Sequence, residues 1–208
     1  MEIELCPAPV LHALAKFTDP KDLRPRCQGV WVENSARGLL LSATDGAALA
    51  VLRVGDRAPC ESFTRLLPTD ALARLPKARA PRVQLVLGPE RAVLDHGGDT
   101  VALPAEIKYL DAVDWRRIVP AEVSYEPGQF SPPLLALFSN LAKALGFKDG
   151  RIRLSQNGES PARVHIVGHA DFIGVASPMR PEFVALPDEQ PFNPTWMLPD
   201  APVEESLT

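Results

Sequence analysis

Leu39-Leu-Leu-Ser-Ala-Thr-Asp-Gly-Ala-Ala-Leu-Ala-Val-Leu52 is the stretch that decides the fold of this chain. Its first five residues form an apolar run of strand length, and residues 47–51 resume that run after Asp45-Gly46. Glycine adopts positive φ at little cost and aspartate tolerates it, so this pair favours a tight turn. The stretch therefore predicts two antiparallel strands joined at Asp45-Gly46, and an ordinary hairpin is its simplest interpretation.

Length and composition limit the classes of protein that the chain can be. It has 208 residues and a formal net charge of −4, which allows one or two domains with a sizeable core. No apolar run is long enough to span a bilayer, and the N-terminus does not resemble a signal peptide, so we expect a cytoplasmic protein. The mild acidity argues against a protein coated in nucleic acid but leaves a local basic face open.

The predicted elements repeat three times at intervals of about sixty residues, each time as strand, helix and three strands. The first repeat has its helix over 10–17 and its strands over 2–5, 27–32, 39–43 and 47–51. The second has strands over 62–67, 82–87, 91–94 and 100–103, with a helix over 70–75 capped by the Thr69 side chain. The third has strands over 122–125, 152–154, 164–167 and 172–176, with a helix over 132–145.

Four segments resemble bacterial sliding clamps, the beta subunit of the replicative DNA polymerase. The segments Gln28-Gly29-Val30, Ala43–Ala50, Asp114–Pro120 and Gly174–Arg180 occur in the order that this family has them. The resemblance covers residues 1 to about 180. It implies an α+β DNA-clamp fold built from βαβββ units, two of which pair to form one domain. We therefore expect a complete clamp-like domain over 1–120, a half domain over 121–180 and a Pro-rich tail over 181–208.

The resemblance also implies a hydrophobic pocket for short apolar peptides of polymerases, clamp loaders or repair proteins. Carried over position by position, the pocket uses Cys27, Thr44, Gly46, Leu49, Val113, Ile118, Val175, Pro178, Met179 and Arg180. Apolar lining with a few polar groups suits such a groove. Ala47 and Ala48 replace a His-Arg pair that is common in the family, and Ser177 replaces a Met, which predicts a shallower pocket or a different peptide motif.

Basic residues on or beside the three predicted helices suggest weak, sequence-independent contact with double-stranded DNA, because the family lines its ring with such helices. They are Lys16, Arg24, Arg26, Arg74, Lys77, Arg79 and Lys143. Solvated helix faces are the competing interpretation. The second helix begins with Thr69-Asp70, where many clamps have basic residues, and this weakens the case for tight DNA binding.

No pattern in the sequence indicates catalysis, a metal or a cofactor. His165 and His169 would lie about 13 Å apart along a strand, and no cysteine or carboxylate cluster completes a metal site. The cysteines Cys6, Cys27 and Cys60 form no CxxC pair, and there is neither a P-loop nor a Gly-x-Ser-x-Gly elbow. We therefore expect a clamp-like processivity factor without enzymatic activity. The alternative is an interaction module that binds partner peptides without encircling DNA.

Counting the repeats predicts a homo-oligomer, because two repeats close one domain and a third is left over. Its strands would present an unpaired edge, and apolar Leu134, Leu137, Phe138 and Leu141 would lie partly uncovered on its helix. A second chain related by a two-fold axis is one cover for these surfaces. The other is the tail over 181–208, which combines five prolines at irregular spacing after residue 186 with several aromatic residues.

Overall fold

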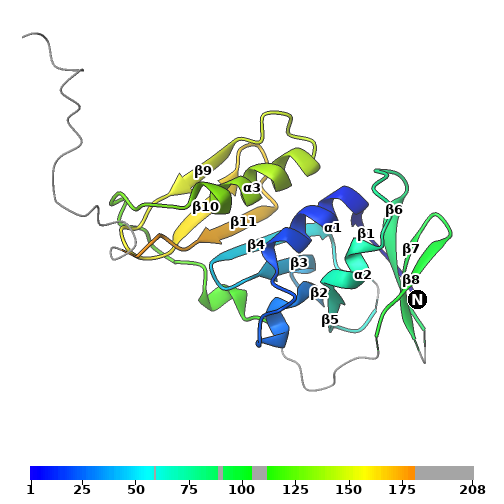
Figure 1. Cartoon of the computed structure of the whole chain (residues 1–208). Coiled ribbons are helices and arrows are strands. Elements are labelled where there is room, and N and C mark those ends of the chain that lie inside the picture. Colours follow the sequence, from blue (N-terminus) through cyan, green and yellow to red (C-terminus); the bar gives the residue numbers. More distant parts are fainter. Residues whose placement is uncertain (59, 89–90, 105–111, 181–208) are drawn as a thin grey trace, which may run out of the picture.

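The computed structural model describes residues 1–58, 60–88, 91–104 and 112–180 (Figure 1). The predicted tail over 181–208 lies outside the described residues. The first repeat comprises β1 (Glu2–Pro7), α1 (Ala8–Leu14), β2 (Gly29–Ser35), β3 (Gly38–Thr44) and β4 (Ala48–Gly55). The second comprises β5 (Phe63–Pro68), α2 (Thr69–Ala73), β6 (Arg82–Leu87), β7 (Ala92–His96) and β8 (Asp99–Ala102). The third comprises α3 (Pro132–Ala144), β9 (Ile152–Ser155), β10 (Ala162–Ile166) and β11 (Phe172–Ala176).

The first two repeats exchange their opening strands. Strand β1 pairs with β6 and begins the four-stranded sheet β1-β6-β7-β8, whereas β5 pairs with β2 and begins the seven-stranded sheet β5-β2-β3-β4-β11-β10-β9. One hydrophobic core takes side chains from both sheets and from all three α-helices of the described residues. The exchange therefore ties the first two repeats together.

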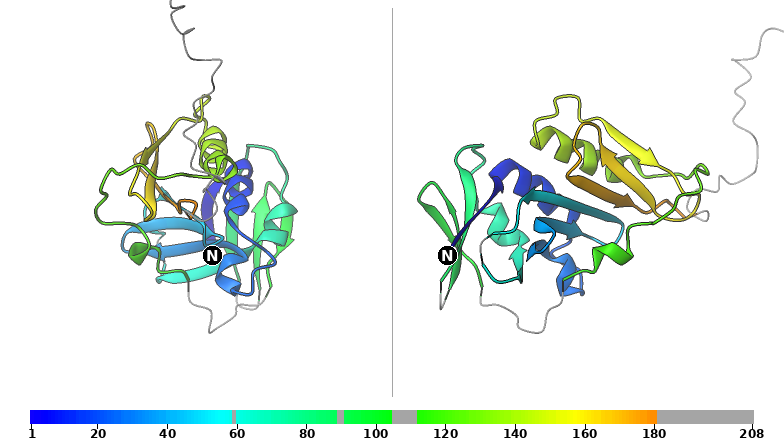
Figure 2. Two further views of the ribbon diagram at one scale, coloured as in Figure 1. Left: turned by 60° about the vertical axis from the view of Figure 1, so that its left-hand side comes forward. Right: turned by 180° about the vertical axis from the view of Figure 1, so that it is seen from behind.

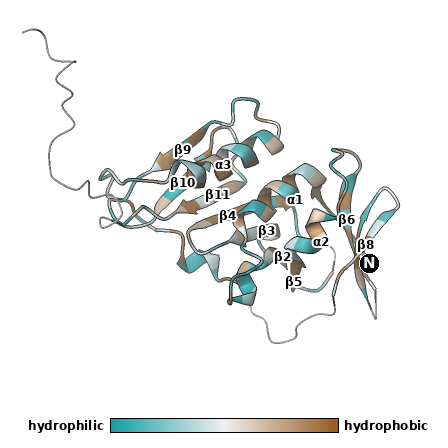
Figure 3. Cartoon of the chain, in the orientation of Figure 1, coloured by the Kyte–Doolittle hydropathy of each residue, from teal (hydrophilic) through white to brown (hydrophobic). Residues whose placement is uncertain are grey.

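The third repeat extends the larger sheet through an antiparallel pairing of β11 with β4. The pairing runs from Phe172 opposite Leu52 to Ala176 opposite Ala48. Figure 3 shows hydrophobic colours where these two strands meet. The strand edge that the sequence left unpaired is thus covered within the chain, and among the described strands of this repeat it is β9 that pairs on one side only.

Helix α3 lies beside α1, so the expectation of a partly uncovered apolar face is wrong for Phe138 and Leu141 and holds for Leu134 and Leu137 (Figures 1 and 2). Phe138 and Leu141 are fully buried, while Leu134 and Leu137 are half-buried against the same core. The Phe138 ring meets Phe17 edge-on at 4.9 Å between centroids and Phe172 at 6.4 Å. Gly174 makes room for this ring, because a Cβ there would lie 2.5 Å from a Phe138 ring carbon.

Three local expectations are wrong. No strand forms over 122–125; instead, the Tyr125 N–H donates to the Gln156 carbonyl at 3.1 Å in a loop. The strand predicted from Cys27 begins at Gly29, because Pro25–Cys27 form a 3₁₀ turn first. Thr69 does not cap α2, which has Pro68 at its N-cap; the Thr69 hydroxyl donates to the Gln28 carbonyl at 2.9 Å instead. At Tyr125 and Thr69 a contact with a distant segment prevails over a local propensity, whereas at Cys27 a local 3₁₀ turn delays the strand.

Replacing Phe138 with alanine should lower the free energy of unfolding by roughly 3–5 kcal/mol, because the cavity lies in a core that cannot collapse around it easily. The measurement is urea denaturation of the full chain. Leu134→Ala is the matched control, and its cost should be clearly smaller because Leu134 is half-buried. Equal, small losses in both variants would show that α3 contributes little to the shared core.

Candidate ligand-binding pocket

A pocket of about 660 Å³ opens where β4 and β11 meet. Ala48, Ala50 and Ala176 on these strands face the main core, so the alternating Leu49 and Val175 face the opposite side of the sheet. There they form a separate small cluster with Val51. The pocket is lined by Leu23, Arg24, Pro25, Arg26, Cys27, Thr44, Gly46, Ala47, Ala48, Leu49, Val113, Ile118, Pro161, Val175 and Ser177.

The turn between β3 and β4 forms one wall of the pocket and is held by its own side chains. The Thr44 hydroxyl donates to the Ala48 carbonyl at 2.6 Å and accepts from the Gly46 N–H at 3.0 Å. One Asp45 carboxylate oxygen accepts from the N–H groups of Ala47 and Ala48, both at 2.8 Å. Asp45 therefore closes the turn, and Gly46 has a φ of 94°, which a glycine adopts readily.

The opposite rim is a loop that Arg24 ties to this turn. Its guanidinium donates to both carboxylate oxygens of Asp22, at 2.6 to 3.2 Å, and to the Asp45 carbonyl at 3.0 Å. A Cβ on Gly46 would lie 2.7 Å from the Arg24 Nη2 atom, so the glycine also makes this approach possible. Between Asp22 and Arg24, the Leu23 side chain is 97% exposed at the mouth of the pocket.

Hydrogen bonds from Arg24 hold the pKa of Asp22 at about 2, well below its ordinary value. A lowered pKa in the folded state means that the contact stabilises the loop fully above the ordinary pKa of aspartate. That contribution is lost as the pH falls from about 4 toward 2. Near neutral pH the Asp22 carboxylate is therefore charged, and it keeps Arg24 at the rim of the pocket.

Val113 and Ile118 form a third wall of the pocket, and the turn between them is anchored by Arg116. The guanidinium makes two hydrogen bonds to the Glu33 carboxylate, at 2.7 and 3.3 Å, and lies 4.2 Å above the Trp115 ring. Burial alone would raise the pKa of Glu33, but hydrogen bonds, chiefly from Arg116, outweigh it and lower that pKa. Trp115 packs on the small cluster around Leu49, so Val113 and Ile118 are placed at the pocket.

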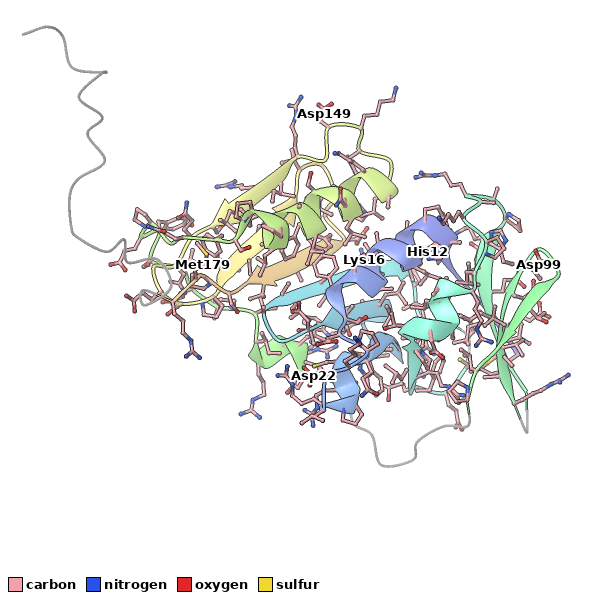
Figure 4. All side chains as sticks on the ribbon, in the orientation of Figure 1. His12, Lys16, Asp22, Asp99, Asp149 and Met179 are labelled. Atoms are coloured by element: carbon pink, nitrogen blue, oxygen red, sulfur yellow. The ribbon has the colours of Figure 1, made fainter. Side chains whose placement is uncertain are left out.

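Seven of the ten residues predicted for the pocket line it, namely Cys27, Thr44, Gly46, Leu49, Val113, Ile118 and Val175. Pro178, Met179 and Arg180 are not among its lining residues. The Met179 N–H donates to the Gln129 carbonyl at 2.7 Å, and Figure 4 shows Met179 at the edge of the third repeat. Met179 therefore joins that repeat to the loop before α3.

Two residues predicted for DNA contact, Arg24 and Arg26, lie at the pocket. The other five, Lys16, Arg74, Lys77, Arg79 and Lys143, are exposed in or just after the helices. Figure 4 labels Lys16 at the end of α1. Arg79 donates to the Ala144 carbonyl at 2.8 Å, at the C-terminal end of α3. Asp70 on α2 is exposed as well, so the helix side of the described residues carries a sparse rather than a dense positive charge.

Sequence reasoning missed the rim residues Leu23, Pro25 and Pro161. The isolated Leu23 within the charged segment Asp19–Arg26 was a usable signal, because a lone apolar side chain in a polar loop has no core to join. Pro161 carries no such signal, since it reaches the pocket only through the pairing of β10 with β11.

The described residues contain no group of three or more His, Cys, Asp or Glu side chains placed to hold a metal ion. Burial raises the pKa of the Cys27 thiol, although Arg24 opposes this, so the one cysteine at the pocket is held in its protonated form. Within the same part of the chain, no helix has the length and apolarity that crossing a membrane requires.

Comparison with solved structures identifies the architecture. A DNA polymerase III beta subunit from Pseudomonas aeruginosa superposes with a TM-score of 0.60 at 18% identity, over 86% of this chain and 66% of that one. The chain has the sliding-clamp fold. The Bacillus subtilis sliding clamp superposes with a TM-score of 0.60 at 15% identity, over 86% of this chain and 64% of that one. The Borrelia burgdorferi beta subunit superposes with a TM-score of 0.60 at 11% identity, over 87% of this chain and 64% of that one. The chain thus spans just under two thirds of their length. No protein-family model and no curated protein matches its sequence.

Replacing Arg24 with glutamine should return the titration midpoint of Asp22 from about 2 to near the ordinary aspartate value of about 3.9. The reason is the loss of the charge-assisted hydrogen bonds that favour the carboxylate. The measurement is an NMR pH titration of the Asp22 carboxyl carbon. Arg37→Gln removes an exposed charge elsewhere and should leave the midpoint unchanged. An unchanged midpoint in Arg24→Gln would mean that this rim contact does not form in solution.

Proposed function

We propose that this protein is a clamp-like tethering factor that binds a short apolar peptide of a DNA polymerase, clamp loader or repair protein in the pocket between β4 and β11. The observation that carries the proposal is the pocket itself, because seven residues from four separate segments converge there as the resemblance implies. Its floor is apolar, and its polar groups lie on the Thr44–Gly46 turn and the Arg24 loop.

The arrangement suits a peptide anchored by one or two large apolar side chains. Burying such a side chain contributes about 1.5–3 kcal/mol, so two anchors give modest affinity and ready exchange of partners. Leu23 and Ile118, which is 40% exposed, stand at the mouth and would be covered by the bound peptide. Tethering of this kind needs no reacting group, which agrees with a protein that acts by holding partners rather than by catalysis.

Charged substitutions at the mouth should abolish peptide binding without unfolding the protein. Leu49 is unsuitable for this test, because it is only 2% exposed and a lysine there would destabilise the sheet. Leu23→Glu and Ile118→Glu change exposed positions, so each should leave the melting temperature within about 2 °C of wild type while weakening peptide affinity at least tenfold.

The measurement uses a random heptapeptide phage library selected on the wild-type chain, followed by fluorescence titration of the enriched peptide. Val167→Glu is the matched control, because Val167 is 51% exposed and does not line the pocket. An enriched peptide that binds all three variants as tightly as the wild type would refute binding at this pocket.

A second proposal is weak DNA binding by the helix side, supported by the exposure of Lys16, Arg74, Lys77, Arg79 and Lys143. The triple change Arg74→Gln, Lys77→Gln and Arg79→Gln should weaken duplex binding at low salt. Each lost phosphate contact should reduce the log–log salt slope by roughly 0.9. The measurement is fluorescence anisotropy with duplexes of unrelated sequence. A DNA affinity that does not change with salt concentration, or no DNA binding at low salt, would contradict this proposal. The alternative of an interaction module that does not encircle DNA would then remain.

Encircling DNA would also require assembly, and we propose β9 as the edge that pairs with a second chain. Among the described residues it ends the seven-stranded sheet and pairs only with β10. Replacing Ile152 with proline removes an N–H from this short strand and should shift the mass measured by light scattering toward that of one chain. Retention on circular but not linear DNA would then separate a ring from a module. A monomeric wild-type chain would count against a ring.

A further inference from the structure

Beside the pocket lies a cluster of basic side chains on the same face of the sheet. One cross-strand row runs from Thr44 to Leu49, then to Val175 and on to Arg163. Directly opposed residues on neighbouring strands project their side chains to the same face, about 5 Å apart. Arg163 is therefore the immediate neighbour of Val175 in the pocket. The next row places His165 opposite Arg153.

This cluster, Arg153, Arg163 and His165, has no anionic partner among the described residues. The ion pairs found among the described residues involve other side chains: they join Arg24 to Asp22, Arg53 to Asp171, Arg82 to Glu4, Arg116 to Glu33 and Arg151 to Asp149. The Arg163 Nε atom is buried and has no hydrogen-bond partner there. Burial, followed by the charges of Arg163 and Arg153, lowers the pKa of His165, as expected where positive charge is uncompensated. Asp171, which directly precedes β11, is already paired with Arg53, so within the described residues no carboxylate pairs with this cluster.

The segment that follows the described chain is rich in carboxylate groups that could pair with this cluster. Residues 181–208 contain no lysine or arginine and six acidic residues, which are Glu182, Asp188, Glu189, Asp200, Glu204 and Glu205. The remaining 180 residues carry a net charge of +2 against −6 for the segment. Between its acidic groups the segment carries large apolar residues, notably Phe192, Trp196 and Met197. An apolar anchor flanked by carboxylates matches an apolar pocket flanked by arginines.

The segment 181–208 also begins close enough to the pocket to occupy it. Ser177 lines the pocket, and its N–H donates to the Ala47 carbonyl at 2.8 Å, only four residues before Pro181. Phe192 and Trp196 follow Arg180 by 12 and 16 residues, which span at most about 40 and 55 Å when extended. The segment therefore reaches the pocket with chain to spare, at an effective concentration on the order of 1 mM.

We propose that residues 181–208 occupy the pocket of their own chain, with an aromatic side chain over Leu49 and Val175 and carboxylates against Arg153 and Arg163. This inference rests on the proposed function and adds its regulation, because a partner peptide must displace the segment. If the free segment binds with a Kd of about 50 μM, an effective concentration near 1 mM weakens partner binding about twentyfold.

The test compares the library-selected heptapeptide on the full chain and on a full chain carrying Phe192→Ser and Trp196→Ser. The double substitution should tighten heptapeptide binding about tenfold or more. A labelled peptide of residues 181–208 should bind a chain ending at Arg180, which retains every strand and α-helix of the described residues, and should bind the full chain at least tenfold more weakly. Arg153→Gln with Arg163→Gln in the shortened chain should weaken that peptide at least fivefold. Arg37→Gln with Arg91→Gln changes two exposed charges elsewhere and should not.

Three outcomes would overturn the inference. Equal heptapeptide affinity of the full chain with and without Phe192 and Trp196 shows that the segment leaves the pocket open, although the proposed peptide binding stands. If the heptapeptide affinity of the full chain rises to that of the double variant when the protein is diluted, the segment of a second copy fills the pocket. Failure of both peptides to bind the shortened chain, with its melting transition intact, removes the proposed function together with its regulation.

Discussion

The pairing of β11 with β4 is the interaction on which the rest of the structure depends. It adds the third repeat to a sheet that already holds the first, and it brings Val175 opposite Leu49 across 126 residues of chain. On one face of this junction the small residues Ala48, Ala50, Gly174 and Ala176 let α1 and α3 pack on the sheet. On the other face the same pairing makes the floor of the pocket. A one-residue slip would reverse both faces at once.

The loops around this junction are fixed mainly by side-chain hydrogen bonds. Asp45 closes its own turn, Asp22 fixes Arg24, and Glu33 fixes Arg116, so each wall of the pocket has one carboxylate that orients it. These three carboxylates are already hydrogen-bonded, so they cannot also neutralise other positive charges near the pocket. Arg153 and Arg163, which have no such partner among the described residues, then determine the charge of the neighbouring surface.

The sequence predicted most of the elements because their hydrophobic periods are regular, and it predicted the Asp45-Gly46 turn because that pair has a specific backbone preference. It placed seven pocket residues through resemblance, since the motif around Thr44 and the segment around Trp115 are distinctive. It could not predict that 122–125 form no strand, because their alternation resembles that of an edge strand. Nor could it reveal that Phe138 is covered by Phe17, a contact between helices 121 residues apart that no local pattern encodes.

The absence of an opening strand over 122–125 has a consequence for how the pocket holds its shape. In the first two repeats, exchange of β1 and β5 locks two units together, but the third repeat has no strand to exchange. Its position is set instead by five residue pairs between β11 and β4 and by the burial of α3 against α1. The strand pairing also forms the floor of the pocket, and α3 packs on the opposite face of β11, so a contact that attaches the repeat also shapes the site. The strands that form the floor are therefore also part of the sheet that holds the fold together, so the floor is fixed by the fold itself.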